Sequence, residues 1–193
     1  MYNTPCIIFA GGKSSRMGED KALLPFAGYK TLAHYQYARL SEIFTTVYIS
    51  CKDASKFDFD ANFLEDIQTN ATFAPTVGFV TAFEKLQSER LFVLSVDTPF
   101  VTSKEIEQLF EADEAKYDAT IARTKEGMQP LCGIYHVSLQ TNFKEMLEKG
   151  NHKLGQLLKD VHTKYVTFEQ TQPFLNLNHP HQYQEALTII RNY

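Results

Sequence analysis

The chain has 193 residues, of which 44% are hydrophobic and 22% are charged, so it has enough apolar material for one folded core. Its 19 basic and 23 acidic residues give a formal net charge of −4, which excludes a general electrostatic attraction to nucleic acid or to an anionic membrane. An anionic ligand would therefore have to be held by a local arrangement of cations and backbone amides.

The expected elements alternate between strands and helices. In chain order they are a strand at Cys6–Ala10, a helix at Thr31–Phe44, strands at Thr46–Cys51, Asn62–Glu65 and Leu91–Val96, a helix from Thr102, strands at Asp118–Arg123 and Pro130–His136, and a helix from Pro180. Most of the strand runs are continuously apolar, which is typical of strands buried on both faces of a parallel sheet. The pattern predicts an α/β fold of three α/β/α layers with an open, mostly parallel, Rossmann-like sheet, in one domain covering residues 1–193.

The three cysteines, Cys6, Cys51 and Cys132, lie far apart in apolar runs. Their spacing fits no zinc site, and their odd number argues against a disulfide framework. The N-terminus lacks a basic segment followed by an apolar one, and no apolar run approaches the length of a membrane span. We therefore expect a soluble cytoplasmic protein.

The glycines after the first strand fit neither of the two common phosphate loops. A Walker A loop ending at Gly12-Lys13-Ser14 would need its first glycine at Ile7, inside the strand. The Rossmann fingerprint also fails, because the glycines stand at positions 11, 12 and 18. The segment nevertheless follows a buried strand, where ligands bind in open α/β sheets.

The loop still has the chemistry of an anion site. Gly11 and Gly12 leave the strand without side chains that would block a ligand, and their amides can form an anion-binding nest. Arg16 offers a guanidinium fork for phosphate oxygens, and Lys21 offers a mobile point charge. The alternative is a tight turn whose cations only decorate the surface. The combination directly after a buried strand favours the phosphate site.

The segment FAGGKSSRMGEDKALL resembles the N-terminal motif of the molybdenum cofactor guanylyltransferase family, Leu-Ala-Gly-Gly-x-Ser-x-Arg-Met-Gly-x-Asp-Lys-x-Leu-Leu. The chain departs from it only at Phe9, where leucine is usual. The resemblance implies that the backbone from Phe9 through Ala10 and Gly11 to Gly12 binds the nucleotide. It implies further that Arg16 and Lys21 contact the triphosphate or the leaving pyrophosphate. It also implies the nucleotide-diphospho-sugar transferase type of sheet.

Further segments resemble the same family. In FLEDI, the resemblance implies that Asp66 contacts the nucleotide, and in VLSVDTPFV that Asp97 is the Mg²⁺ ligand. An aspartate at the carboxyl end of a buried strand also points into the ligand cleft on physical grounds, and Mg²⁺ needs only one or two carboxylates besides substrate phosphates. In LNLNHPHQY, the resemblance implies that Asn176 and Asn178 face the pterin, whereas an asparagine there could equally cap the following helix.

Three segments depart from the family pattern. The Gly-Pro-Leu-Ala-Gly loop of the family reads Ala74–Gly78 here, with only the proline and Gly78, an expected nucleotide contact, retained. Ser50 replaces a frequent asparagine, and Asn151–Lys153 carries one clear cation where a basic stretch is expected. These departures concern the substrate side of the site.

The resemblance implies transfer of GMP from GTP to the terminal phosphate of molybdenum-bound molybdopterin, with release of pyrophosphate and with Mg²⁺ as cofactor. Expected partners are GTP and molybdopterin, with other cofactor-biosynthesis proteins or apo-molybdoenzymes as further candidates, and neither nucleic acid nor membrane. The alternatives are a related transferase that uses CTP or a sugar-phosphate acceptor, and a non-catalytic carrier of nucleotide or molybdopterin.

Overall fold

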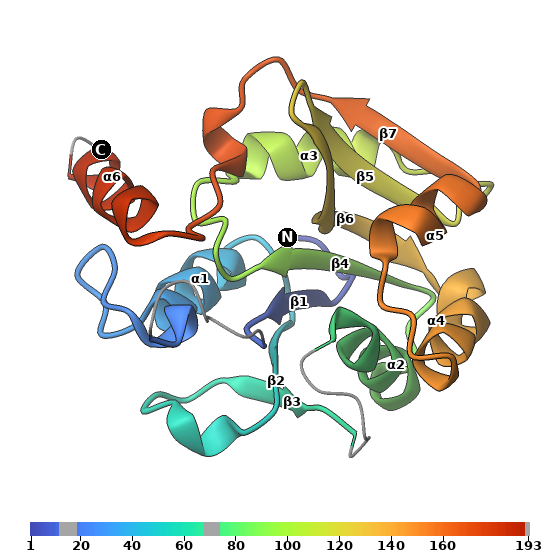
Figure 1. Cartoon of the computed structure of the whole chain (residues 1–193), viewed down its shortest axis with the longest axis horizontal. Helices are drawn as coiled ribbons and strands as arrows, with labels where there is room; N and C mark the ends of the chain where they lie inside the picture. The colour runs from blue at the N-terminus through green and yellow to red at the C-terminus, as the bar shows by residue number, and fades with distance from the viewer. Residues whose placement is uncertain (12–18, 68–73, 192–193) are drawn as a thin grey trace.

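The computed structural model describes residues 1–11, 19–67 and 74–191 and contains one seven-stranded sheet in the order β3-β2-β1-β4-β6-β5-β7 (Figure 1). The strands are β1 (Cys6–Phe9), β2 (Val47–Cys51), β3 (Asn62–Glu65), β4 (Arg90–Ser95), β5 (Ala119–Thr124), β6 (Gly127–His136) and β7 (Thr163–Thr167). Within the described residues, β6 alone runs antiparallel to both of its neighbours, β4 and β5. The prediction of an open, mostly parallel sheet is confirmed.

Six of these strands were expected from the sequence, and their ends differ from expectation by at most three residues. The helices are α1 (Leu32–Ser41), α2 (Pro75–Leu86), α3 (Ser103–Ala112), α4 (Gln140–Glu148), α5 (Leu154–Asp160) and α6 (Pro180–Ile190). The helices expected from Thr102 and Pro180 begin where predicted, and Thr102 and Glu105 form the capping box. The patterns did not predict α2, α4, α5 or β7.

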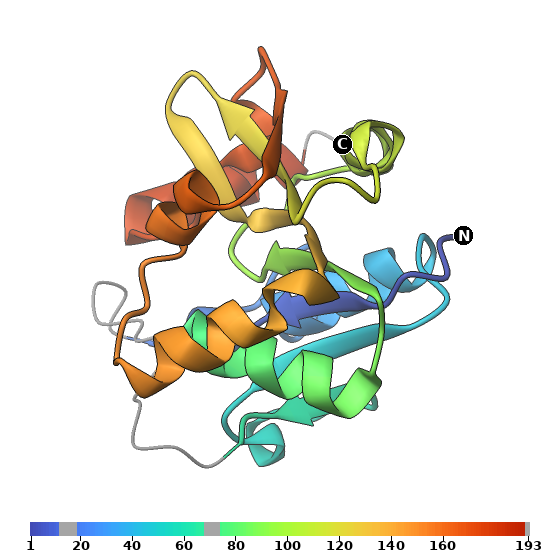
Figure 2. The same ribbon diagram turned by 90° about the vertical axis from the view of Figure 1, so that its right-hand side faces the viewer.

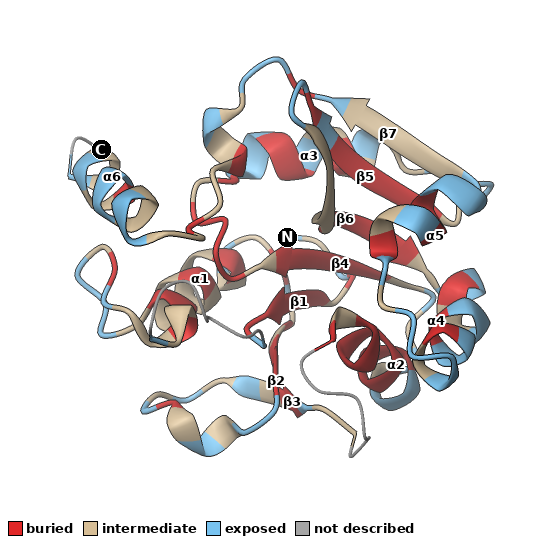
Figure 3. Ribbon diagram, in the orientation of Figure 1, coloured by how far each residue is buried: buried red, intermediate tan, exposed pale blue. Residues whose placement is uncertain are grey.

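The helices form one layer on each face of the sheet, so the expectation of three layers is confirmed. Ile8 points into a core that α1, α3 and α6 share, whereas its neighbour Ile7 points into a core that α2, α4 and α5 share. Figure 2 shows α2 and α4 side by side, where the rings of Phe79 and Phe143 stack with their centroids 4.3 Å apart. The central strands are buried on both faces (Figure 3), as continuous apolar runs require.

One glycine lets α2 approach the carboxyl edge of the sheet. A Cβ atom at Gly78 would lie 2.5 Å from a ring carbon of Phe9 and 2.7 Å from the hydroxyl oxygen of Ser50. Any side chain there would push the first turns of α2 away from the ends of β1 and β2. Gly78 is therefore required for packing, whatever it does toward a ligand.

The three cysteines are buried and unpaired, as expected. Burial raises the pKa of Cys51 to about 11 and that of Cys132 to about 12, so both stay as neutral thiols near pH 7. Among the described residues, no helix has both the length and the apolar character needed to cross a membrane.

Candidate active site

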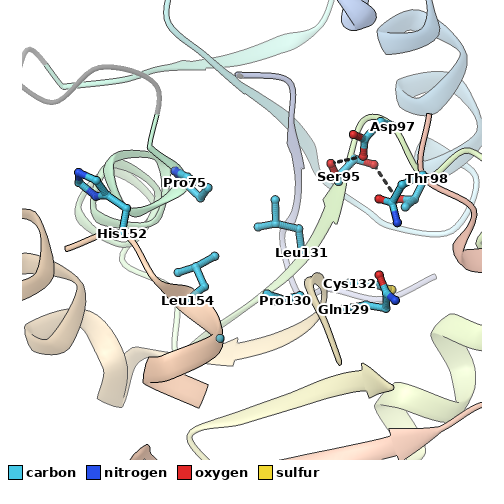
Figure 4. Close-up of a pocket in the computed structure, with 12 residues that line it drawn as sticks. Pro75, Ser95, Asp97, Thr98, Gln129, Pro130, Leu131, Cys132, His152 and Leu154 are labelled. Atoms are coloured by element: carbon cyan, nitrogen blue, oxygen red, sulfur yellow. Dashed lines mark hydrogen bonds between the residues drawn. The ribbon is translucent and has the colours of Figure 1, made fainter. Parts of the chain in front are cut away.

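A cavity of about 360 Å³ opens at the carboxyl edge of β4, beside the start of β6 (Figure 4). Because β6 is reversed, its first residues lie at the same edge as the last residues of β4, with Cys132 opposite Leu94. Figure 4 shows Ser95, Asp97 and Thr98 on one side of the cavity, and His152 and Pro75 on the other. Its lining residues are Pro75, Ser95, Asp97, Thr98, Gln129, Pro130, Leu131, Cys132, His152, Leu154, Gly155 and Asn176.

Asp97 is the acidic group on this cavity wall, two residues beyond the end of β4. Its Oδ2 accepts a hydrogen bond of 2.6 Å from Lys21 Nζ, and its Oδ1 accepts one of 2.6 Å from the Ser95 hydroxyl. The backbone carbonyl of Asp97 accepts from the amide of Leu177 at 2.9 Å. The carboxylate is thus fixed from both sides and remains 12% exposed toward the cavity.

Lys21 lies at the start of a short 3-10 turn, Lys21–Leu23, that Asp20 caps. Asp20 Oδ1 accepts from the amide of Ala22 at 3.1 Å, and Asp20 Oδ2 accepts from Lys56 Nζ at 2.7 Å. The cap places Lys21 so that its ammonium reaches both Asp97 and Asn178, which are 76 and 157 residues away along the chain.

The two asparagines before α6 take different positions. Asn178 Oδ1 accepts a hydrogen bond of 2.9 Å from Lys21 Nζ, while the Gln182 side chain accepts from the amides of Asn178 and His179 at the start of α6. The alternative that the Asn178 side chain caps this helix is therefore wrong. Asn176 donates to the Phe174 carbonyl at 3.0 Å and lines the cavity. Contact of either asparagine with a pterin stays a prediction.

A second, smaller pocket lies between the ends of β1 and β2 and the start of α2. Its lining residues are Phe9, Gly11, Ser50, Lys52, Asp66, Ala74, Pro75 and Gly78. Asp66 accepts a 3.4 Å hydrogen bond from the Ser50 hydroxyl. Burial raises the pKa of Asp66 to about 6, and the Ser50 hydrogen bond opposes this shift. Four of the expected nucleotide contacts, Phe9, Gly11, Asp66 and Gly78, therefore meet in one pocket.

Three more contacts were expected in the segment after β1, at Ala10, Gly12 and Arg16. Gly12 and Arg16 lie outside the described residues. The amide of Ala10 donates to the Ser50 carbonyl at 3.0 Å as an extension of the sheet, so a nucleotide contact of this amide would have to replace a sheet hydrogen bond.

Among the lining residues that were not predicted from the sequence, Ser95 and His152 bear most directly on the chemistry of the site. Ser95, which fixes Asp97 Oδ1, is the last residue of β4, and its position two residues before the aspartate is the only signal that could have indicated it. His152 Nδ1 lies 2.7 Å from the hydroxyl of the buried Thr76 in the first turn of α2. His152 falls in the segment Asn151–Lys153, where a basic stretch was expected. Among the lining residues it is the group able to carry positive charge.

The oxygens around Asp97 suit a hard divalent cation. Asp97 Oδ2 and Asn178 Oδ1 lie 2.6 and 2.9 Å from Lys21 Nζ, so they converge on a position that already holds a positive charge. Mg²⁺ binds through one or two carboxylates together with substrate phosphates. No cluster of three His, Cys, Asp or Glu side chains that could hold a metal occurs in the described part of the chain. Within that part, the protein oxygens would supply only some of the ligands of a metal ion, and phosphate oxygens of a bound nucleotide would have to supply others.

The comparisons with known proteins agree with the geometry. The family model for the MobA-like NTP transferase domain matches residues 6–165. A protein of Campylobacter jejuni subsp. doylei named molybdenum cofactor guanylyltransferase is 38% identical over 180 residues, which are 93% of each chain. One of the same name from Helicobacter pylori is 31% identical over 194 residues, covering 98% of this chain and 94% of the relative.

A solved structure has the same fold over nearly the whole length. Molybdopterin-guanine dinucleotide biosynthesis protein A of Archaeoglobus fulgidus superposes with a TM-score of 0.84 at 21% identity, covering 98% of this chain and all of that one. The sheet with its reversed strand, the motif from Phe9 to Leu24 and the two full-length relatives lead to one conclusion. The chain belongs to the family of MobA-like NTP transferases.

Proposed function

We propose that this chain transfers GMP from GTP to the terminal phosphate of molybdenum-bound molybdopterin and releases pyrophosphate. The observation that carries the proposal is the convergence of Asp97 and Asn178 on the Lys21 ammonium, beside the cavity that Asp97 lines, in a chain whose relatives bear the name molybdenum cofactor guanylyltransferase. Residues 1–193 would act as one catalytic domain.

In this proposal each of the two pockets holds one of the two substrates. The pocket with Asp66 and Gly78 would hold the nucleoside of GTP, and the larger cavity with His152 and Asn176 would hold the acceptor. Asp97 lies on the wall of the larger cavity, and Pro75 lines both. The α-phosphorus of GTP would therefore be held near Asp97.

The reaction is a single in-line displacement. A terminal phosphate oxygen of the acceptor forms a bond to the α-phosphorus, the bond from that phosphorus to the bridging oxygen breaks, and pyrophosphate leaves with the electron pair. The attacking oxygen is already anionic near pH 7, because the second pKa of a phosphate monoester is about 6. No general base is required, so the chain contributes position and charge.

Asp97 would hold Mg²⁺, with Asn178 close enough to share the site, and the fixed orientation of the carboxylate follows from the Ser95 hydrogen bond. When bound, Mg²⁺ supplies charge neutralisation on the phosphate oxygens. Lys21 would place its ammonium on the triphosphate or on the leaving pyrophosphate, and Arg16 would act beside it. His152, fixed by Thr76, would face the acceptor phosphate.

The proposal is tested with purified protein, Mg²⁺ and molybdenum-loaded molybdopterin, to which GTP, CTP, ATP or UTP is added. Of the four nucleotides, we expect only GTP to give pyrophosphate release and a dinucleotide product. Release with CTP, or with a sugar phosphate in place of molybdopterin, would replace GMP transfer by a related transfer. Selective stabilisation by GTP in a thermal-shift assay without any pyrophosphate release would indicate a carrier.

A further inference from the structure

The loop that carries Asp97 has few hydrogen bonds of its own. Residues 95–101 connect the end of β4 to the capping box of α3, and inside the loop the amide and the hydroxyl of Thr98 both donate to the Ser95 carbonyl. The Ser95–Asp97 contact holds the carboxylate relative to the loop. Two backbone bonds connect the loop to its surroundings: the Val96 amide donates to the Phe9 carbonyl on β1 at 3.0 Å, and the Leu177 amide donates to the Asp97 carbonyl at 2.9 Å.

A completely buried side-chain amide on α1 adds a third connection, and it bonds the loop at more than one carbonyl. Gln36 is 0% exposed, and its Nε2 lies 3.1 Å from the Thr98 carbonyl oxygen, 3.2 Å from that of Val96 and 3.4 Å from that of Ser95. These three carbonyl groups lie on both sides of Asp97. One side chain therefore contacts the backbone before and after the carboxylate.

Arg39, one turn later on α1, extends the contact. Its Nε donates to Gln36 Oε1 at 2.6 Å, and its Nη1 donates to the Val101 carbonyl at 2.6 Å. The first of these bonds orients the Gln36 amide so that its nitrogen faces the loop, and the second holds the far end of the loop.

The position of Arg39 is unfavourable without such a role. Burial lowers the pKa of its guanidinium, and its Nη2 is buried without a hydrogen-bond partner among the described residues. Arg39 as a whole is half-buried, but a guanidinium nitrogen that is buried without a partner costs free energy, since its desolvation is not repaid in full. An apolar residue would fill this helix position at lower cost, so stability alone does not account for it.

We propose that Gln36 and Arg39 are positioning residues that fix the Ser95–Val101 loop, and with it Asp97, against α1. This inference rests on the proposed function, because its purpose is to place the Asp97 carboxylate for transfer. A displacement of about 1 Å at a reacting group can cost on the order of a hundredfold in rate. Neither residue lines the cavity.

The test compares Gln36→Leu and Arg39→Met with a matched control, Thr120→Val. Thr120 is also 0% exposed, and its hydroxyl donates to Asp113 at 2.7 Å, away from the cavity. Each of the three variants therefore removes a side chain that donates hydrogen bonds inside the fold. Arg39→Lys keeps a charge and a donor that can reach the loop, and it serves as the conservative variant.

We expect Gln36→Leu and Arg39→Met to lower kcat by roughly tenfold to a hundredfold. The KM for GTP should stay within about twofold, while the half-saturating Mg²⁺ concentration rises. Arg39→Lys should recover part of kcat, and Thr120→Val should keep the wild-type kcat even if its melting temperature falls as far. Wild-type kcat and Mg²⁺ dependence in both Gln36→Leu and Arg39→Met would overturn the inference.

A second readout does not depend on activity. Hydrogen exchange of the peptide covering residues 95–101 should be faster in Gln36→Leu and Arg39→Met than in Thr120→Val. Unchanged exchange would overturn the inference. Faster exchange with unchanged kcat would overturn it as well, because the two residues would then stabilise the loop without positioning Asp97 for transfer. If the wild-type protein transfers no GMP at all, the proposed function fails, whereas this exchange experiment still decides whether the loop is held by α1.

Discussion

The two ends of β4 each hold an aspartate paired with a cation, but in different surroundings. At its carboxyl end, Asp97 contacts Lys21 at 2.6 Å beside an open cavity. At its amino end, Arg90 Nη1 contacts Asp113 at 2.8 Å, and His136 Nε2 contacts the same carboxylate at 3.0 Å. The side chain of Asp113 is 0% exposed, compared with 12% for Asp97.

The difference supports a structural role for the Asp113 pair and agrees with the functional role proposed for the Asp97 pair. Asp113 also accepts from the Thr120 hydroxyl, so three neighbouring side chains satisfy it and connect the end of α3 to β4, β5 and β6. Asp97 faces a cavity, where a ligand can replace its partners. An ion pair alone indicates neither role. What distinguishes the two is whether a ligand can reach the carboxylate and replace the side chains that contact it.

Asp97→Asn should give the largest effect on activity. The substitution keeps the shape of the side chain and removes its charge, so a bound metal loses its carboxylate. With several kcal/mol at stake, GMP transfer should fall roughly 10²- to 10⁴-fold. Pyrophosphate release measures the loss, and a melting temperature within a few degrees of wild type shows that the fold is intact. Near-normal turnover at saturating Mg²⁺ would remove Asp97 from the site.

Asp113→Asn should show the opposite pattern at the other end of β4. We expect a loss of roughly 2–3 kcal/mol in the free energy of unfolding, measured with urea, and an unchanged kcat per folded molecule. A fall in kcat at full folding would contradict the comparison.

The acid dependence of stability should change in the same variant. Burial acts to raise the pKa of Asp113, but hydrogen bonds from His136, Thr120 and Arg90 outweigh burial and hold this pKa below its usual value. A depressed folded-state pKa stabilises the fold above the unfolded pKa of about 4, and this stabilisation is lost as the pH falls through the folded value. Asp113→Asn should lack that part of the acid-induced loss.

His152→Ala tests the acceptor side of the same edge. The substitution removes a hydrogen-bond donor to the phosphate of molybdopterin. It should therefore raise the KM for molybdopterin by roughly tenfold, which corresponds to about 1.4 kcal/mol, and leave the KM for GTP unchanged. Thr76→Val keeps the imidazole but removes its 2.7 Å partner, so it should give a smaller shift in the same direction. An equal rise in both KM values would place His152 outside the acceptor site.

Asp66 should give the smallest effect, visible as a pH dependence. Because its pKa is raised to about 6, the carboxylate takes up a proton as the pH falls from 7 to 5.5 and accepts hydrogen bonds less well. GTP affinity should therefore weaken severalfold over this range. GTP also takes up a proton near pH 6, so the informative quantity is the difference from Asp66→Asn, whose pH dependence should be flatter. Parallel pH profiles of the two proteins would contradict a role for this carboxylate.

Much of the parallel half of the sheet could be predicted from the sequence. Continuous apolar runs such as Cys6–Phe9 mark strands buried on both faces, and the capping box at Thr102 marks the start of α3. The motif resemblance also brought Lys21, Asp97 and Asn178 into one expected site, although up to 157 residues separate them.

The rest could not be predicted, for physical reasons. In α2, every residue from Thr76 to Phe83 is buried, so the helix has no alternation of polar and apolar faces that would indicate it. The edge strand β7 is half-buried and carries the mixed sequence TKYVT. In the sequence, Gln36 and Arg39 resemble the polar face of a surface helix. Only the fold shows that both side chains donate hydrogen bonds to the Ser95–Val101 loop.

The reversed strand β6 has a consequence for how such a site can diverge. The pocket proposed for the nucleotide lies between the ends of β1 and β2 and the start of α2, where a Cβ atom at Gly78 would lie 2.5 Å from a ring carbon of Phe9. One wall of the cavity proposed for the acceptor instead comes from Gln129 to Cys132, which follow a hairpin turn at Gly127 with φ of +133°. A change in this hairpin can therefore alter the cavity wall without changing the strand ends that line the smaller pocket.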